Sequence, residues 1–449
     1  MNKRDLENIA SEIEREESLF AHKEYLDALK SAPAIIGRED KARELARFLL
    51  SSRKGHVVPF ISVYGRAGSG KSTLVKFVCE NLPDISYRFV NLRRAKTVFG
   101  CANLILAEFG VPNLKSAQGI NVAIEKIGEA IESALGADKK RLFVLALDEF
   151  DVLFYDKRGR PSDFIYKLLV MQEKQREKGR LVCIIAISNN VVVDQDVDDR
   201  VRSRMGSSEV FFGAYSKKDV LEILQDRAKS AFALPADPEV LEYCAEMSSS
   251  EHGDARRAID LLRVAAEIAG KKGEKKLAKT HVDGASEQLQ KERINTVLSG
   301  ASLHLKLVCS AVARITFLTG EDWHSTSSLY DQYVLMVSRH AKGVKPLMYR
   351  RVSELLTELE NTGLVTSQTG SRGRRGYGSQ YKLTAPPEAI GSACFADWWK
   401  SVVKKKKEHD EIEKSGAGLK LPTKSPYSGL SQQLESMYKD EWDTYVGNT

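Results

Sequence analysis

The stretch that most constrains this chain is rich in glycine and ends in a lysine and a serine: Gly65-Arg66-Ala67-Gly68-Ser69-Gly70-Lys71-Ser72. It follows an apolar run at 59–64, and a segment with helical spacing of apolar residues begins at Thr73. A strand, a glycine-rich turn and a helix start in this order form the setting of a phosphate-binding P-loop. Glycine lets successive backbone N–H groups point towards one anion, and the helix N-terminus adds unpaired donors and partial positive charge.

The lysine and serine indicate the chemistry at the end of this turn. Lys71 supplies a full positive charge to the β- and γ-phosphates of a nucleotide, and Ser72 offers a hydroxyl to Mg²⁺. A chance glycine turn is the alternative interpretation. It does not explain why a strand, a turn, the Lys-Ser pair and a helix occur in register. We therefore expect this stretch, continued to Thr73, to bind a phosphate chain with magnesium.

Two carboxylates follow a second apolar run. Residues 141–147 form a continuous apolar segment of the kind found in a parallel strand covered on both faces. Asp148 and Glu149 come directly after it, and ligands bind at this end of a strand in open α/β sheets. We expect Asp148 to hold the magnesium shell and Glu149 to orient and polarise the attacking water. Acidic loop residues without a role are the alternative, which the upstream P-loop disfavours.

A third apolar run, at 181–187, ends near Asn189, whose amide could reach the γ-phosphate or the lytic water. Several arginines follow between 200 and 204. One of them could act as an arginine finger that stabilises phosphoryl charge in a neighbouring subunit. An ordinary surface helix remains the alternative for this segment.

Composition sets wider limits. A chain of 449 residues is too long for one core, and 42% hydrophobic with 29% charged residues is typical of globular domains. No apolar run reaches membrane-spanning length, and the charged N-terminus lacks a signal core, so we expect an intracellular protein. The six cysteines are scattered without a CxxC pair, which favours buried thiols over disulfides or zinc. A net charge of +7 permits nucleic-acid binding without establishing it.

The C-terminal third has the pattern of a winged helix. Helical spacing covers 303–318, 328–340 and 349–359, and two strand-like segments then flank a loop of glycine and arginine at 370–378. The third helix of such a domain enters the major groove, and the wing reaches phosphates or the minor groove. The candidate DNA contacts are Arg350, Arg351, Arg372, Arg374, Arg375 and Tyr377. A winged helix that binds only protein, or a plain flexible loop, is the alternative.

As a set, these motifs resemble the archaeal origin-recognition initiators of the Orc/Cdc type, a branch of the AAA+ ATPases, over about residues 20–385. The glycine-rich stretch resembles Walker A, and Asp148 to Asp151 resemble Walker B. By the same resemblance Asn189 corresponds to sensor 1, Arg204 to the arginine finger with Arg200 as the nearby alternative, and Arg256 in Gly253-Asp254-Ala255-Arg256 to sensor 2. The helix after Asn91-Leu92-Arg93 is similar to the initiator-specific insertion that contacts DNA, which adds Arg93 and Arg94 to the candidates.

The resemblance implies a fold and a domain division. The fold is an α/β AAA+ P-loop parallel sheet with a helical lid and a C-terminal winged-helix domain. The expected divisions are an N-terminal arm at 1–30, an AAA+ base at 31–213, a lid at 214–298, a DNA-binding winged helix at 299–385 and a C-terminal extension of open role at 386–449. ATP or ADP with Mg²⁺ would lie between base and lid, with Ile35 and Ile36 packing on the nucleotide base.

The resemblance also implies a function. The chain would be a weak, switch-like ATPase that recognises double-stranded origin DNA and helps recruit or load the replicative helicase. Its expected partners are that helicase and paralogous initiator subunits, with no membrane, and its expected place is the cytoplasm, on the nucleoid. Two alternatives stay open: a nucleotide-regulated transcription regulator or divergent paralogue that loads no helicase, and a loader-like AAA+ protein whose winged helix contacts only protein.

Overall fold

The computed structural model divides into two compact units, residues 1–289 and 290–449. It describes residues 5, 19–27, 35–55, 57–138, 141–191, 197–206, 208–250, 254–341, 343–371 and 377–414. Among these residues, no helix combines the length and the apolar character that a membrane span requires. Part of the expected wing, including Arg372, Arg374 and Arg375, and the end of the chain from 415 onward lie outside the described residues.

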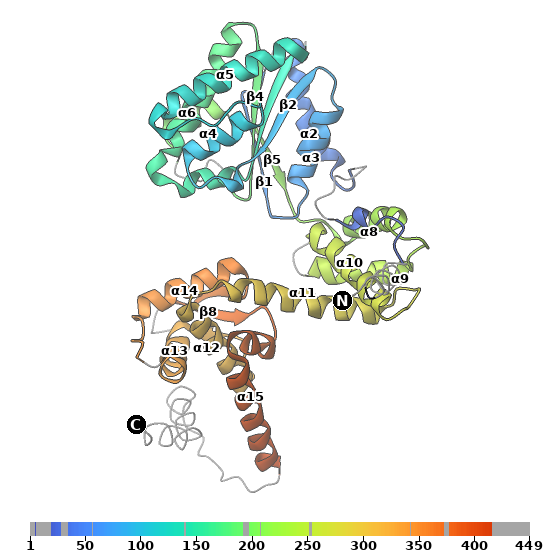
Figure 1. Cartoon of the computed structure of the whole chain (residues 1–449), viewed down its shortest axis with the longest axis vertical. Coiled ribbons are helices and arrows are strands. Elements are labelled where there is room, and N and C mark those ends of the chain that lie inside the picture. Colours follow the sequence, from blue (N-terminus) through green and yellow to red (C-terminus); the bar gives the residue numbers. More distant parts are fainter. Residues whose placement is uncertain are drawn as a thin grey trace. The chain divides into compact units, whose positions relative to one another are not determined.

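A parallel sheet of five strands forms the centre of the first unit (Figure 1). The spatial order is β2-β3-β4-β1-β5, so β1 lies between β4 and β5 although it comes first in the chain. This arrangement confirms the expected α/β class. The strands are β1 (Phe60–Gly65), β2 (Ile85–Asn91), β3 (Leu142–Asp148), β4 (Leu181–Ser188) and β5 (Glu209–Phe212).

Helices cover both faces of this sheet, as Figure 1 shows. One face packs against α2 (Glu39–Leu50) and α3 (Lys71–Asn81), and the other packs against α4 (Val98–Ala107), α5 (Gly119–Asp138) and α6 (Pro161–Glu177). Because both faces are covered, β3 is apolar along its length, and its residues 142–147 are at most 1% exposed. The short helix α7 (Asp199–Met205) follows β4.

The helices α8 (Lys217–Ala231), α9 (Pro238–Ser250) and α10 (Ala255–Lys271) continue the first unit after the sheet. The next helix, α11 (Lys279–Ser299), begins in this unit and ends in the second. Ser216 and Asp219 form a capping box that fixes where α8 begins. Residues 19–27 of the predicted N-terminal arm pack on this helical region. Leu26 is fully buried there, and the Phe20 ring stacks on the Phe232 ring at 5.6 Å.

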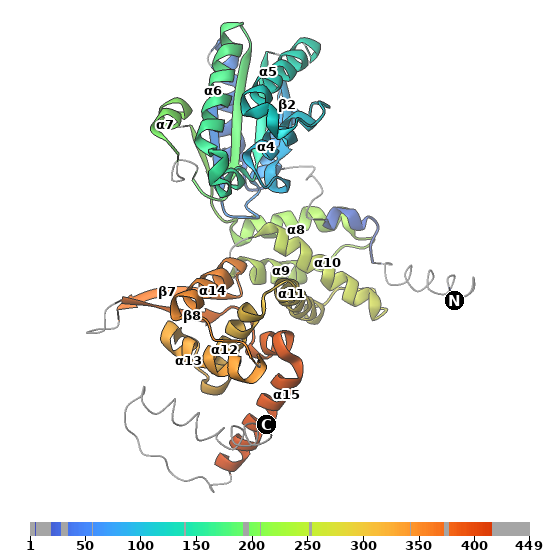
Figure 2. The same cartoon turned by 60° about the vertical axis from the view of Figure 1, so that its left-hand side comes forward.

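The second unit has the expected winged-helix pattern. Its helices α12 (Leu303–Thr319), α13 (Thr326–His340) and α14 (Tyr349–Thr362) precede a hairpin of β7 (Val365–Ser371) and β8 (Tyr377–Leu383). The short strand β6 (His324–Ser325) pairs with β8, which gives the order β6-β8-β7. In Figure 2 the hairpin lies beside α14.

The segment after 386, whose structure the sequence left open, begins as helix α15 (Pro387–Lys414). Ile390, Trp399 and Val402 are buried, and the Trp399 ring packs on the Phe317 ring of α12 at 5.3 Å. Phe395 has non-helical dihedral angles, so the helix bends there. The first part of the predicted extension therefore belongs to the core of the winged-helix unit.

Candidate functional site

A cavity lies at the carboxyl ends of the central strands, where the glycine-rich turn leads from β1 into α3. Gly68 and Gly70 have φ values of 72° and 89°, which glycine adopts without strain. The cavity brings together most of the residues predicted for phosphate and magnesium. Its lining consists of Ala67, Gly68, Ser69, Gly70, Lys71, Ser72, Asp148, Glu149, Ile187, Ser188, Asn189 and Arg256.

The ammonium group of Lys71 lies inside the turn and donates hydrogen bonds to its backbone. Its Nζ donates to the carbonyl oxygens of Gly65 at 2.6 Å and Arg66 at 2.8 Å, and to Oδ1 of Asn189 at 3.3 Å. The side chain is 7% exposed, and burial lowers its pKa, while the nearby Asp148 acts in the opposite direction. Gly65 and Arg66 thus contribute carbonyls to the lysine and do not line the cavity themselves.

Ser72 and Asp148 form an oxygen-rich pair beside Lys71. The Ser72 hydroxyl donates to both Asp148 carboxylate oxygens, at 3.0 and 3.1 Å. Asn91, which is opposite Asp148 in the sheet register, donates its amide to Oδ2 at 3.3 Å. Hydroxyl and carboxylate oxygens are the hard ligands that Mg²⁺ takes, usually together with phosphate oxygens and water. These residues therefore fit a magnesium ion.

Glu149 begins the turn after β3 in a left-handed conformation, with φ of 55°. Non-glycine residues rarely adopt this conformation, and such strain is concentrated at functional sites. Burial raises the pKa of Glu149, and the carboxylates of Asp148 and Asp151 raise it further. Arg93, 3.8 Å away, and Lys71 act in the opposite direction. A carboxylate with a raised pKa at a cavity wall is suited to accept a proton.

A second cavity adjoins the first and is lined by both predicted isoleucines, Ile35 and Ile36, together with Thr73 and Arg256. Arg38 and Tyr215 also line it, although neither belongs to a motif that could be recognised in the sequence. Arg38 donates to the carbonyl oxygens of Ser69 at 3.1 Å and Gly213 at 2.6 Å, and its guanidinium lies 3.9 Å from the centre of the Tyr215 ring. An apolar wall with a stacked aromatic ring suits a planar nucleobase.

The lid helix α10 approaches the glycine-rich turn closely at its N-cap residue, Asp254. This residue caps α10, because its carboxylate accepts from the backbone N–H groups of Arg256 at 2.9 Å and Arg257 at 3.4 Å. A Cβ atom added to Gly68 would lie 1.8 Å from Asp254 Oδ1. The turn and the lid helix therefore approach so closely that only glycine fits, and Arg256 lines both cavities from this position.

Replacing Gly68 by alanine should separate the start of α10 from the turn. The added methyl group meets the Asp254 carboxylate, and a φ of 72° costs an alanine about 1–2 kcal/mol. Hydrogen exchange at residues 255–258 should become faster. Gly273→Ala is the matched control, since Gly273 has the same φ of 72° and nothing within 4 Å of its Cβ position. Equal exchange in both variants would show that the close approach is unimportant.

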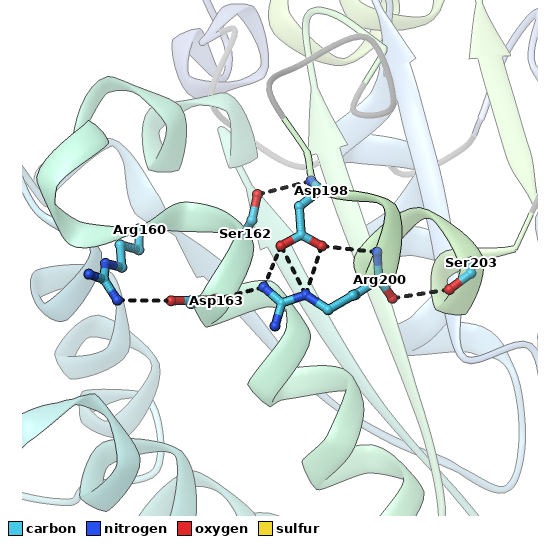
Figure 3. A network of polar contacts seen from close by, with 6 residues as sticks. All are labelled: Arg160, Ser162, Asp163, Asp198, Arg200 and Ser203. Atoms are coloured by element: carbon cyan, nitrogen blue, oxygen red, sulfur yellow. Dashed lines mark hydrogen bonds and ion pairs between the residues drawn. The ribbon is translucent and has the colours of Figure 1, made fainter.

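The two arginine-finger candidates on α7 are paired within their own chain. Arg200 donates to the Asp198 carboxylate through Nε and Nη2 and to Asp163 Oδ1 at 3.4 Å (Figure 3). Arg204 Nε donates to Glu173 Oε1 at 3.1 Å. Neither arginine lines the cavity that Lys71 lines. Whether either one reaches a neighbouring subunit stays a prediction.

The basic residues predicted for DNA lie in two regions. Arg93 and Arg94 are exposed in the short helix η3 (Leu92–Arg94) at the end of β2. Arg350 and Arg351 are exposed in the first turn of α14, where both pair with Glu354, at 3.6 and 2.6 Å. Of the wing residues, Arg372, Arg374 and Arg375 lie outside the described residues, and Tyr377 begins β8.

Three family descriptions match the chain in order. They are the ATPase family associated with various cellular activities (AAA) at 61–212, the Cdc6 AAA+ ATPase-type lid domain at 221–287 and the CDC6 C-terminal winged helix domain at 296–393. An ORC1-type DNA replication protein of Thermococcus kodakarensis is 32% identical over 384 residues, which cover 83% of this chain and 90% of the relative. A relative of the same name from Desulfurococcus amylolyticus is 31% identical and is covered over 90% of its length.

A solved structure has the same fold along most of the chain. The Aeropyrum pernix ORC1 protein in complex with DNA superposes with a TM-score of 0.67 at 28% identity, covering 86% of this chain and 99% of that one. Base, lid and winged helix therefore occur together in a known protein.

Proposed function

Since this chain belongs to the family of archaeal ORC1-type DNA replication proteins, which are AAA+ ATPases, we propose that it is an ATP-binding replication initiator that recognises duplex origin DNA and helps recruit or load the replicative helicase. The observation that supports this most strongly is the shared cavity of Lys71, Asp148 and Glu149 with Arg256 from the lid, in a chain that also carries a winged helix. The Aeropyrum relative was solved with DNA, which favours the same class of ligand here.

The proposed division of the chain is an ATPase base at 31–213, a lid at 214–298 and a DNA-binding winged helix at 299–385, whose core also includes the first part of α15. In the base, Lys71 and the turn amides bind the phosphates, and Ser72 with Asp148 holds Mg²⁺. The bound ion neutralises phosphate charge and orients the phosphate oxygens. Ile35, Ile36 and Tyr215 enclose the nucleobase, a role supported by the second cavity.

Glu149 accepts the proton of the attacking water, and Asn189, which already bonds Lys71, orients that water against the terminal phosphate. Arg256 contacts the phosphates from the lid, so the lid position depends on which nucleotide is bound. Such a ligand-dependent lid suits a switch.

We expect the chain alone to be a weak ATPase. Among the described residues that line the phosphate cavity, the cations are Lys71 and Arg256. An arginine finger accelerates phosphoryl transfer by about 10³–10⁵ where it is present. Arg204, or Arg200 in its place, would supply that charge from a neighbouring copy or a paralogous subunit.

Removing both arginines from the start of α14 should weaken duplex binding and flatten its salt dependence. Each lost phosphate contact reduces the slope of log K against log salt by about 0.9, so Arg350→Ala with Arg351→Ala should lower it by about 2. The measurement is fluorescence anisotropy on a duplex across a salt series. Lys271→Ala with Lys272→Ala, on the exposed end of α10, removes the same charge elsewhere. A slope equal to that of this control would exclude a phosphate contact.

Chromosomal occupancy tests the function as a whole. Immunoprecipitation of the chain from its host should enrich the sites at which replication begins, and depletion of the chain should delay initiation there. Enrichment at promoters, with initiation unaffected, would instead support the nucleotide-regulated transcription regulator. A chain with no duplex affinity at all would support a loader whose winged helix contacts protein.

A further inference from the structure

Large apolar side chains are exposed at the start of α14 and in the residues just before it. Of the seven large hydrophobic residues that are exposed in the described part of the chain, Val344, Met348 and Tyr349 lie within six consecutive positions. Met348 is 81% exposed and Tyr349 is 46% exposed. Exposed apolar residues scattered singly are common, but a group of them at one functional element indicates a contact surface.

Neighbouring residues fix the backbone just before Met348 and the ring of Tyr349. The backbone N–H of Leu347 donates to the hydroxyl of Tyr333 at 3.0 Å, and His304 Nδ1 lies 2.8 Å from the same hydroxyl. The Tyr349 ring packs edge-on against the Tyr330 ring at 5.4 Å. Tyr333 itself is fully buried. The start of α14 is thus tied to the core of the winged-helix unit.

Met348 occupies a position that stability alone does not favour. It is the N-cap of α14 and forms no side-chain cap hydrogen bond. The helices α12 and α13 have Ser302 and Ser325 as their N-caps, and each serine hydroxyl accepts from a backbone N–H of the first turn. An apolar residue at the N-cap is disfavoured relative to serine. Met348 therefore lacks the capping hydrogen bond that a serine would form, and it exposes apolar surface at the same position.

We propose that Met348 and Tyr349 read thymine by contacting its C5-methyl group. This rests on the proposed function and on α14 being the third helix of the winged-helix domain, which enters the major groove. The N-terminal residues of a recognition helix are the ones that reach base edges. In the major groove the thymine methyl is the apolar group that a base pair presents. Arg350 and Arg351 directly follow the pair in the first turn of α14, where both are paired with Glu354. Arginines beside a base-reading position are suited to phosphate contacts.

The test removes only the methyl groups. A duplex recovered by selection from a randomised library is synthesised once with thymidine and once with deoxyuridine, and anisotropy gives both affinities. The wild-type chain should bind the deoxyuridine duplex about four-fold more weakly for each methyl group that it buries. Met348→Ser with Tyr349→Ser should bind the thymidine duplex as weakly as the wild type binds the deoxyuridine duplex, and should not distinguish the two.

Two control variants distinguish loss of thymine recognition from loss of stability and from loss of charge. Met348→Ser alone supplies the cap residue found at Ser302 and Ser325, so its thermal midpoint should equal or exceed that of the wild type while methyl discrimination falls. Arg350→Ala should weaken binding to both duplexes and keep the discrimination. Equal wild-type affinity for the two duplexes, or full discrimination in the double serine variant, overturns the inference and leaves the proposed function standing. A chain that binds no duplex overturns both.

Discussion

Replacing Lys71 by alanine should lower the affinity for ATP at least a hundred-fold. The ammonium group lies inside the turn, 2.6 and 2.8 Å from two turn carbonyls, and is positioned to bridge from them to a bound phosphate. Hydrogen bonds that involve a charged group contribute about 1.5–3 kcal/mol each, so losing two such bonds from Lys71 to the phosphates costs about 3–6 kcal/mol of binding free energy. Each 1.4 kcal/mol is a factor of ten.

Titration calorimetry with ATP and magnesium measures this effect directly. Lys76→Ala is the matched control, because Lys76 lies on the same helix and its Nζ is over the Phe89 ring at 4.3 Å, away from the cavity. The control should bind ATP like the wild type. An ATP affinity in Lys71→Ala that stays within ten-fold of the wild type would contradict the assignment of the turn as a phosphate site.

Replacing Glu149 by glutamine should reduce ATP turnover by about 10²–10⁴ and leave ATP affinity nearly unchanged, because a neutral amide cannot accept the proton of the attacking water. Burial and the carboxylates of Asp148 and Asp151 raise the pKa of Glu149 above its ordinary value of 4.5. A carboxylate with a raised pKa becomes protonated at a higher pH than usual. Wild-type turnover should therefore fall as the pH drops through that raised pKa.

Single-turnover hydrolysis at several pH values, measured beside ATP affinity, tests this role. Glu80→Gln serves as the control, since Glu80 bonds the Tyr87 hydroxyl on the surface and lines neither cavity. If Glu149→Gln retained full turnover, Glu149 would not be the general base. Loss of affinity and turnover together would instead indicate a binding role.

The central sheet and the phosphate cavity could be predicted because their signals are local. The runs that form β3 and β4 are continuous and apolar, and the candidate site residues at their ends follow within two positions. Parallel strands put their carboxyl ends at one edge, so Asp148 and Asn189 had to come near Lys71 once the topology was assumed. The structure confirms this convergence.

Contacts between distant segments could not be predicted in the same way. Arg38 stacks on Tyr215, and Gly68 touches Asp254, and neither pair shares a local pattern.

The α15 segment illustrates a different difficulty. The most evident feature of its sequence is the run of lysines at 404–407, which indicates an exposed segment. The side chains that it buries in the core of the second unit, such as Ile390 and Trp399, are few and widely spaced.

The paired state of the α7 arginines bears on how copies of this chain would associate. Arg200 is already satisfied by Asp198 and Asp163, and Arg204 by Glu173. To serve a phosphate across a subunit boundary, either one must first release its own carboxylate. The free energy gained is therefore the difference between the new contacts to the phosphate and the ion pairs given up within the chain. If copies of the chain associate through this helix, one set of ion pairs would be exchanged for another, and substitutions of Asp163, Glu173 or Asp198 would shift that balance.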